Sequence, residues 1–205
     1  MKKFAQNWNG NIVCAIDTET TGNDPKIHEV IEIAIVALDS NFIPRTDMLP
    51  FNIKIKPDKL EYISNEAMKI NKINLPNLIL TGFERFKAAD LLDEWFAQLK
   101  LAPGKKILPL AQFWTYDKEF IKEWIGIENF DFIFDYHYRD TGVIAQYIND
   151  RAVMHEEKPP FPKVNLSYLC SQLEIQNLNR HTALGDCVAV AAVYRQMLMN
   201  GPLLM

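Results

Sequence analysis

Two acidic side chains, Asp17 and Glu19, stand two residues apart in the stretch AIDTETTG, directly after an apolar run. Residues i and i+2 of a β-strand project from the same face, about 7 Å apart. Two carboxylates that converge in this way stay ionised together only if a cation neutralises them. Carboxylate oxygens are hard ligands that suit Mg²⁺ or Mn²⁺. A divalent metal site is therefore one interpretation of the pair, but a lone D-x-E more often reflects a turn cap, here Asp17, beside a solvated acid, here Glu19.

A histidine and a carboxylate, His181 and Asp186, stand five residues apart in HTALGD near the C-terminus. On one continuous helix this spacing would place them about 140° apart, on different faces. They can meet at one site if His181 lies in the loop before the helix and Asp186 in its first turns, with Thr182 as the N-cap. The alternative is an exposed loop histidine beside an aspartate that favours the helix dipole.

A further acidic residue, Asp117, follows an apolar strand-like run in AQFWTYDKEF. It has two interpretations, as the N-cap of the next helix or as another metal ligand, and capping is the more common role of such a residue.

The elements that must position these residues follow from the hydrophobic periodicity. Strands are expected at residues 11–18, 30–39, 51–56, 105–113 and 130–136. Helices are expected at residues 82–99, 116–125, 140–148, 165–175 and 183–199, the third of them capped by Asp140 or Thr141. Residues 151–163 carry three prolines and no period, so we expect a mobile loop there. This order predicts an α/β fold, a mixed sheet with helices on both faces and the site at its strand ends.

Composition and charge restrict the class of protein. With 205 residues, 48% hydrophobic and 23% charged, the chain can build one substantial core, so we expect a single domain over residues 1–205. A net charge of −4 argues against nucleic-acid binding through a broad basic surface, although a local, metal-bridged contact stays open.

Localisation is predicted from the cysteines and the apolar segments. The three cysteines form no CxxC pair, which favours small buried hydrophobes in a reducing compartment. The first residues lack the apolar region of a secretory signal, and the apolar runs fall short of the ~20 residues that span a bilayer. We expect a cytoplasmic protein without a membrane segment.

Taken together and in order, these motifs resemble those of the DEDDh branch of the DnaQ-like 3′-to-5′ exonucleases, which have a ribonuclease H-like fold. DTETTG is similar to the first family motif, D-x-E-x-T-G, and HTALGD matches the third, H-x-A-x-x-D. Asp117 falls where the second motif has its aspartate. The resemblance covers residues 11–199 and implies a five-stranded mixed sheet with one antiparallel strand.

The resemblance implies a metal-dependent exonuclease that removes nucleoside monophosphates from the 3′ end of single-stranded nucleic acid, DNA slightly favoured over RNA. Two divalent ions, Mg²⁺ or Mn²⁺, would be held by Asp17, Glu19, Asp186 and Asp117. His181 would be the general base, since a histidine, with an ordinary pKa of about 6.5, suits proton removal near neutral pH. The terminal nucleotide would be contacted by Thr20, Thr21 and Gly22.

The sequence departs from the family at one place. Gln112 and Phe113 stand where the family often has a His-Asn pair, which changes the expected path of the substrate strand beside Phe113 and Trp114. Either aromatic residue could stack on a base, an interaction of ~1–3 kcal/mol, or pack in the core.

Partners and pathway are less constrained by these residues. A proofreading or repair subunit that works with a polymerase and a free-standing trimming enzyme would show the same motifs, and the oligomeric state is open. Two other classes stay in view, a ribonuclease H-like module that binds without cleaving and a metal-dependent phosphodiesterase that acts on small nucleotides.

Overall fold

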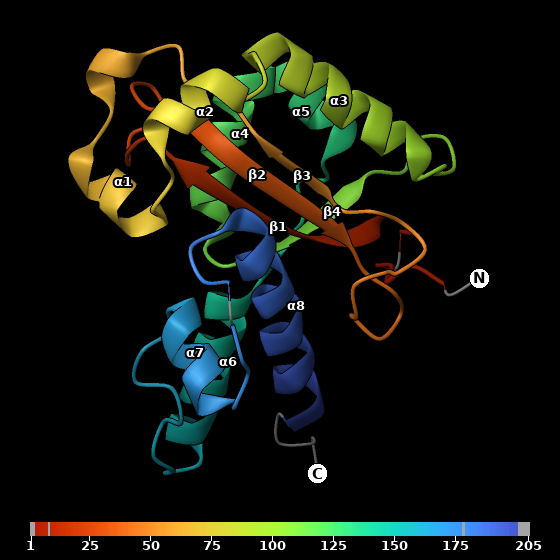
Figure 1. Cartoon of the computed structure of the whole chain (residues 1–205). Helices are drawn as coiled ribbons and strands as arrows, with labels where there is room; N and C mark the ends of the chain where they lie inside the picture. The colour runs from red at the N-terminus through yellow and green to blue at the C-terminus, as the bar shows by residue number, and fades with distance from the viewer. Residues whose placement is uncertain (1–2, 8, 178, 201–205) are drawn as a thin grey trace.

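The centre of the fold is a five-stranded sheet in the order β3-β2-β1-β4-β5 (Figure 1). The computed structural model describes residues 3–7, 9–177 and 179–200. β2 runs antiparallel to both of its neighbours, whereas β4 pairs in parallel with β1 and with β5. The predicted mixed sheet with one antiparallel strand is therefore confirmed. The strands are β1 (Ile12–Thr20), β2 (Val30–Ala37), β3 (Phe51–Lys54), β4 (Ile107–Ala111) and β5 (Arg139–Asp140).

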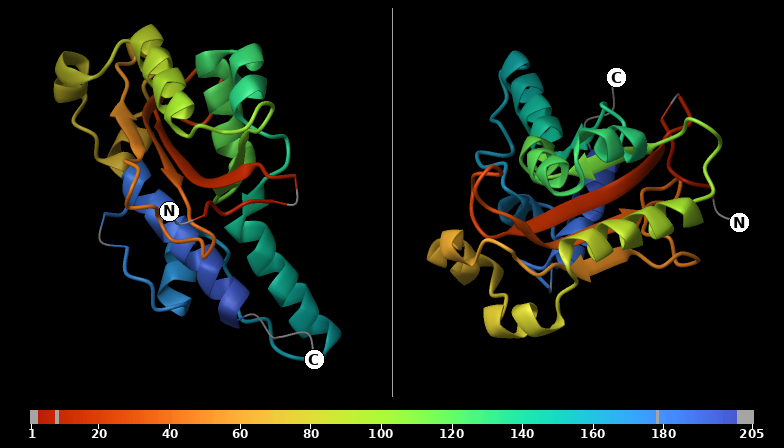
Figure 2. Two further views of the ribbon diagram at one scale, coloured as in Figure 1. Left: turned by 90° about the vertical axis from the view of Figure 1, so that its right-hand side faces the viewer. Right: turned by 90° about the horizontal axis from the view of Figure 1, so that it is seen from above.

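Helices cover both faces of the sheet, as the views in Figure 2 show. One face carries α3 (Arg85–Gln98), α4 (Trp114–Ile125) and α5 (Ile127–Ile133). The other carries α8 (Ala183–Asn200), against which α6 (Thr141–Met154) and α7 (Leu166–Gln172) pack. Among the described residues, none of the helices combines the length and apolar character needed to cross a bilayer.

The alternation of side chains along β1 determines where its acidic end points. Ile12, Cys14 and Ile16 lie in the core under α3, α4 and α5. Val13 and Ala15 pack instead with residues of α8. Because Asp17 and Glu19 continue the odd-numbered series, their carboxylates lie on the α8 side of the sheet.

The segment between β3 and α3 forms short helices for which the periodicity gave no prediction, the 3₁₀ turn Leu60–Tyr62, α1 (Asn65–Asn71) and α2 (Leu75–Thr81). This segment supports the end of β1. The Ser64 backbone N–H donates to the Thr21 carbonyl at 2.8 Å, and the buried Asn71 amide donates to the Thr20 carbonyl at 3.3 Å.

The predicted strand at 130–136 is wrong. Residues 127–133 form α5, and the fifth strand is the short Arg139–Asp140 pair. The buried residues Phe130 and Ile133 lie on one face of α5, and the buried Phe134 ends the helix with an extended backbone, while Phe132 is 68% exposed. Apolar residues at every second position suggested a strand, but the side chains pack on the core at helical spacing.

The loop predicted at 151–163 begins later, because α6 continues to Met154. Beyond it the chain is anchored by Phe161, whose side chain is buried and whose backbone exchanges two hydrogen bonds of 2.9 and 2.7 Å with the Asn149 side chain. The helix at 140–148 is confirmed with Asp140 as its N-cap, since Asp140 accepts from the N–H groups of Gly142 and Val143.

Candidate active site

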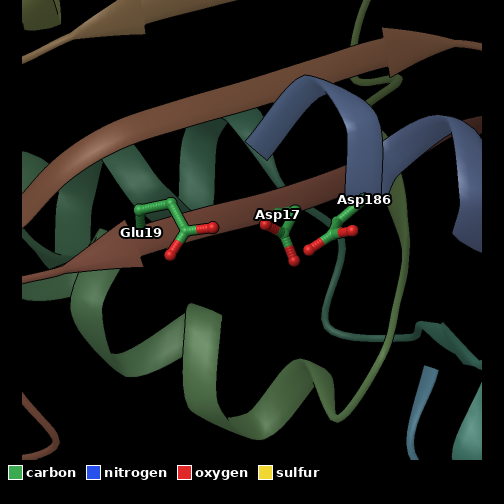
Figure 3. Close-up of side chains that lie close together, drawn as sticks. All are labelled: Asp17, Glu19 and Asp186. Atoms are coloured by element: carbon green, nitrogen blue, oxygen red, sulfur yellow. The ribbon is translucent and has the colours of Figure 1, made fainter. Parts of the chain in front are cut away.

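Three carboxylates meet at the end of β1 where α8 begins (Figure 3). Asp17 and Glu19 come from β1, and Asp186 comes from the first turn of α8. One oxygen of each side chain lies within 4.8 Å of the others, and all three residues are partly buried. The donor set is made of hard anionic oxygens, which fits a divalent cation such as Mg²⁺ or Mn²⁺.

The electrostatics of this cluster are unfavourable for the carboxylates by themselves. Burial, followed by the charges of Asp117 and Asp186, raises the pKa of Asp17 well above its usual value. Burial, followed by the charge of Asp186, raises the pKa of Glu19 to about 8. A cation bound between these oxygens would remove the repulsion and favour the ionised forms.

Asp117 lies in the first turn of α4 and is 3% exposed. Its Oδ1 accepts from the backbone N–H of Thr18 at 3.0 Å and from the Thr18 hydroxyl at 2.6 Å. Burial raises the pKa of Asp117 to about 7, although the bonds from Thr18 act in the opposite direction. The N-cap alternative is wrong, because Phe113 occupies that position. Asp117 lies outside the group of three, but its charge acts on Asp17.

His181 and Asp186 take the predicted positions, one in the loop and the other in the first turn of α8. Thr182 caps the helix by accepting from the Gly185 N–H at 3.2 Å. His181 has a left-handed backbone, with φ of 63°, and its N–H donates to Asp186 Oδ2 at 3.3 Å. The backbone of the proposed base thus contacts a proposed metal ligand directly.

The turn after β1 is held by the hydroxyls that the resemblance assigned to the substrate. The Thr20 hydroxyl donates to the Gly22 carbonyl at 2.7 Å, and the Thr21 hydroxyl accepts from the Glu29 N–H at 2.9 Å. Both side chains are buried. A Cβ at Gly22 would lie 2.2 Å from His28 Cδ2, so a side chain here would have to displace the His28 ring. These residues shape the turn, and their predicted contacts with a terminal nucleotide stay a prediction.

The two aromatic residues of the second motif differ in their surroundings. Trp114 is 1% exposed and packs on Phe130 and Phe134, so it belongs to the core and cannot stack on a base. Phe113 is 44% exposed and has a left-handed backbone with φ of 61°. Gln112 is structural, since its amide donates to the Val164 carbonyl at 2.8 Å and its Oε1 accepts from the Thr141 hydroxyl at 2.7 Å.

The motifs alone did not identify three further residues at the site. Glu32 is 4% exposed and pairs in register with Glu19 on one side and Lys54 on the other; a glutamate inside the apolar run of β2 was the signal. Tyr116 donates to the Gly22 carbonyl at 3.0 Å and lies 2.8 Å from the Thr20 hydroxyl. Asn177 donates to Asp186 Oδ1 at 2.6 Å, and no pattern in the sequence marks it.

The fold and the carboxylate cluster together define a ribonuclease H-like protein with an acidic group that could hold a metal ion. A family model described as Exonuclease (RNase_T) matches residues 14–194. The chain therefore belongs to this exonuclease family, and the predicted relationship to the DEDDh exonucleases is confirmed.

Solved structures with the same fold include three nucleases. Cell-death related nuclease 4 (CRN-4) superposes with a TM-score of 0.72 at 20% identity, covering 92% of this chain and 64% of that one. E. coli Exonuclease I in complex with a dT13 oligonucleotide gives 0.67 at 21% identity, covering 93% of this chain and 41% of that one. The nuclease domain of 3′hExo, described as a DEDDh family member bound to rAMP, gives 0.67 at 17% identity, covering 92% of each chain. No curated protein sequence matches the chain.

The raised pKa of Glu19 predicts how stability depends on pH. Between the usual value near 4.5 and about 8, the folded protein binds more protons than the unfolded chain, so metal-free protein loses stability as pH rises through this range. A difference of one pH unit between the folded and unfolded pKa corresponds to about 1.4 kcal/mol. A change of 1 kcal/mol in the free energy of unfolding shifts Tm by about 2–4 °C for a domain of this size.

Thermal unfolding in EDTA from pH 5 to pH 9 measures this effect. Wild-type Tm should fall over that range more steeply than the Tm of Glu19→Gln, because the glutamine side chain at position 19 does not titrate. Mn²⁺ should raise the wild-type Tm more at pH 8 than at pH 5, because protons compete with the cation. Identical pH profiles for the two proteins would contradict the raised pKa.

Proposed function

We propose that this chain is a metal-dependent 3′-to-5′ exonuclease that releases nucleoside monophosphates from single-stranded nucleic acid. The observation that carries the proposal is the convergence of Asp17, Glu19 and Asp186 within 4.8 Å, in an environment that raises the pKa of the first two. Membership of the exonuclease family supports it. Apolar residues would stabilise the end of a strand better than a group of partly buried acids. Stability alone therefore does not explain why these acids are present.

The proposed cofactor is a pair of divalent ions, Mg²⁺ or Mn²⁺. Asp17, Glu19 and Asp186 would hold them, with Asp117 in support from α4. When bound, such ions activate water as a nucleophile and stabilise the leaving oxygen of a phosphodiester. Thr18 donates two hydrogen bonds to the Asp117 carboxylate and orients it beside β1, which would allow this supporting role.

The remaining steps fall to the side chains of the chain itself. His181, in the loop before α8, would remove the proton from the attacking water. The turn at residues 20–22, fixed by Tyr116, would limit the space for the terminal nucleotide. Phe113, exposed at the N-terminus of α4, is the residue that we assign to stacking on a base.

Single-stranded substrates suit a chain with a net charge of −4, because a site that binds a few terminal nucleotides needs few phosphate contacts. Of the related solved structures, Exonuclease I is bound to a deoxyribonucleotide oligomer and the 3′hExo nuclease domain is bound to a ribonucleotide. We propose that DNA is slightly preferred over RNA as the substrate and that the protein is cytoplasmic. It would either work beside a polymerase in replication or repair, or trim nucleic acid independently.

The direct test uses matched 5′-labelled single-stranded DNA and RNA oligonucleotides with Mg²⁺, Mn²⁺ or EDTA. Shortening from the 3′ end should require the metal, stop with a 3′-phosphate, and disappear in Asp17→Ala. Undiminished activity of Asp17→Ala would refute the assignment. A wild-type protein that binds Mn²⁺ but shortens neither polymer would favour a small-nucleotide phosphodiesterase or a non-cleaving module, and a series of shorter substrates separates these.

The role of His181 has its own test in the variant His181→Asn, which keeps a polar side chain but removes the base. At saturating Mn²⁺ the variant should lose about 10²–10⁴-fold in kcat. The Mn²⁺ concentration for half-maximal rate should stay close to the wild-type value, because the metal carboxylates are unchanged. A variant with wild-type kcat would exclude His181 as the base.

A further inference from the structure

Two residues of the segment before α8, Asn177 and His181, contact Asp186 in the first turn of that helix. The Asn177 side-chain amide donates to Asp186 Oδ1 at 2.6 Å, and the His181 backbone N–H donates to Oδ2 at 3.3 Å. Each oxygen of this carboxylate thus has a donor from the loop. Figure 3 shows Asp186 facing Asp17 in this orientation.

Asp186 needs such support more than its two neighbours do. Asp17 and Glu19 sit on β1, which is paired with β2 opposite both residues. Asp186 instead starts from the first turn of α8, on a different element of the fold. The hydrogen bonds that the structure gives its carboxylate come from the Asn177 amide and the His181 backbone, both outside the helix.

The loop is also anchored at points that do not involve Asn177. The Thr182 hydroxyl donates to the Asn179 carbonyl at 2.8 Å, and Arg180 Nη2 donates to the Ser167 hydroxyl of α7 at 2.6 Å. A Cβ at Gly185 would lie 2.1 Å from the Asn179 carbonyl oxygen, so this close approach requires glycine. Removal of the Asn177 amide therefore leaves the course of the loop supported.

We propose that Asn177 is a positioning residue for the metal centre, whose amide holds Asp186 in the orientation that completes the ligand set with Asp17 and Glu19. The inference rests on the proposed metal-dependent function. Hydrogen-bond partners of metal ligands typically contribute about 10–100-fold to metal affinity or activity. The effect of Asn177 is transmitted through Asp186 and needs no contact with substrate.

The test compares Asn177→Leu, which keeps approximate size without a donor, and Asn177→Ala with wild-type protein. Calorimetric titration with Mn²⁺ should show an affinity about 10–100-fold lower in both variants, while Tm in EDTA stays close to wild type. In the nuclease assay, the Mn²⁺ concentration for half-maximal rate should rise, and most of kcat should return at saturating Mn²⁺.

The matched control is Asn149→Leu, which removes a comparable amide pair with Phe161 away from the site. It should lower Tm and leave Mn²⁺ affinity unchanged. Wild-type Mn²⁺ affinity in both Asn177 variants, with or without a lower Tm, would overturn the inference. A wild-type protein that binds Mn²⁺ without shortening oligonucleotides would refute the proposed function instead, and the titrations would still decide the role of Asn177.

Discussion

The repulsion among carboxylates gathered at the end of β1 is the constraint on which the rest of the site depends. Asp17, Glu19 and Asp186 lie together and Asp117 lies close by, and burial makes their shared charge more costly than it would be in water. Such an arrangement persists in a folded protein when a cation or protons neutralise it. The raised pKa values favour protons on Asp17 and Glu19 when no metal is bound, and the three carboxylates form a donor set that fits a divalent cation.

The sheet brings the end of β1 and the start of α8 together, because both contact the same residue of β2. Asp17 pairs with Ala34 of β2, and the thiol of Cys187, the residue after Asp186, donates to the Ala34 carbonyl at 3.3 Å. The start of α8 is therefore docked on the sheet at the level of Asp17. The small residues Ala34 and Ala183 are fully buried at this contact, which allows the helix to approach closely. Packing on the α8 face thus sets the distance between Asp17 and Asp186, which are 169 positions apart in the sequence.

Much of the site could be predicted from the sequence because its parts are local patterns. The spacing of Asp17 and Glu19 on a strand, the position of His181 before a helix and the cap at Asp140 each depend on near neighbours in the chain, and the structure places them as expected. The order of strands and helices predicted the mixed sheet for the same reason.

The features that escaped prediction depend on tertiary contacts. The alternating pattern at residues 130–136 forms a helix because α5 packs its Phe130 face on the core. Trp114 is buried although it lies beside the exposed Phe113, and the hydroxyls of Thr20 and Thr21 are used by the turn. Asn177 acts through a bond to a side chain on a different element, which no local pattern reveals.

The central claim, that a divalent cation offsets the charge of these acids, is tested most directly by calorimetric titration of Mn²⁺ at pH 7 in buffers of different ionisation enthalpy. We predict binding to the wild-type protein with release of protons from the acids whose pKa is raised, and weaker binding with fewer protons released in Asp17→Asn. An absence of Mn²⁺ binding, or equal affinity and proton release in the two proteins, would contradict it.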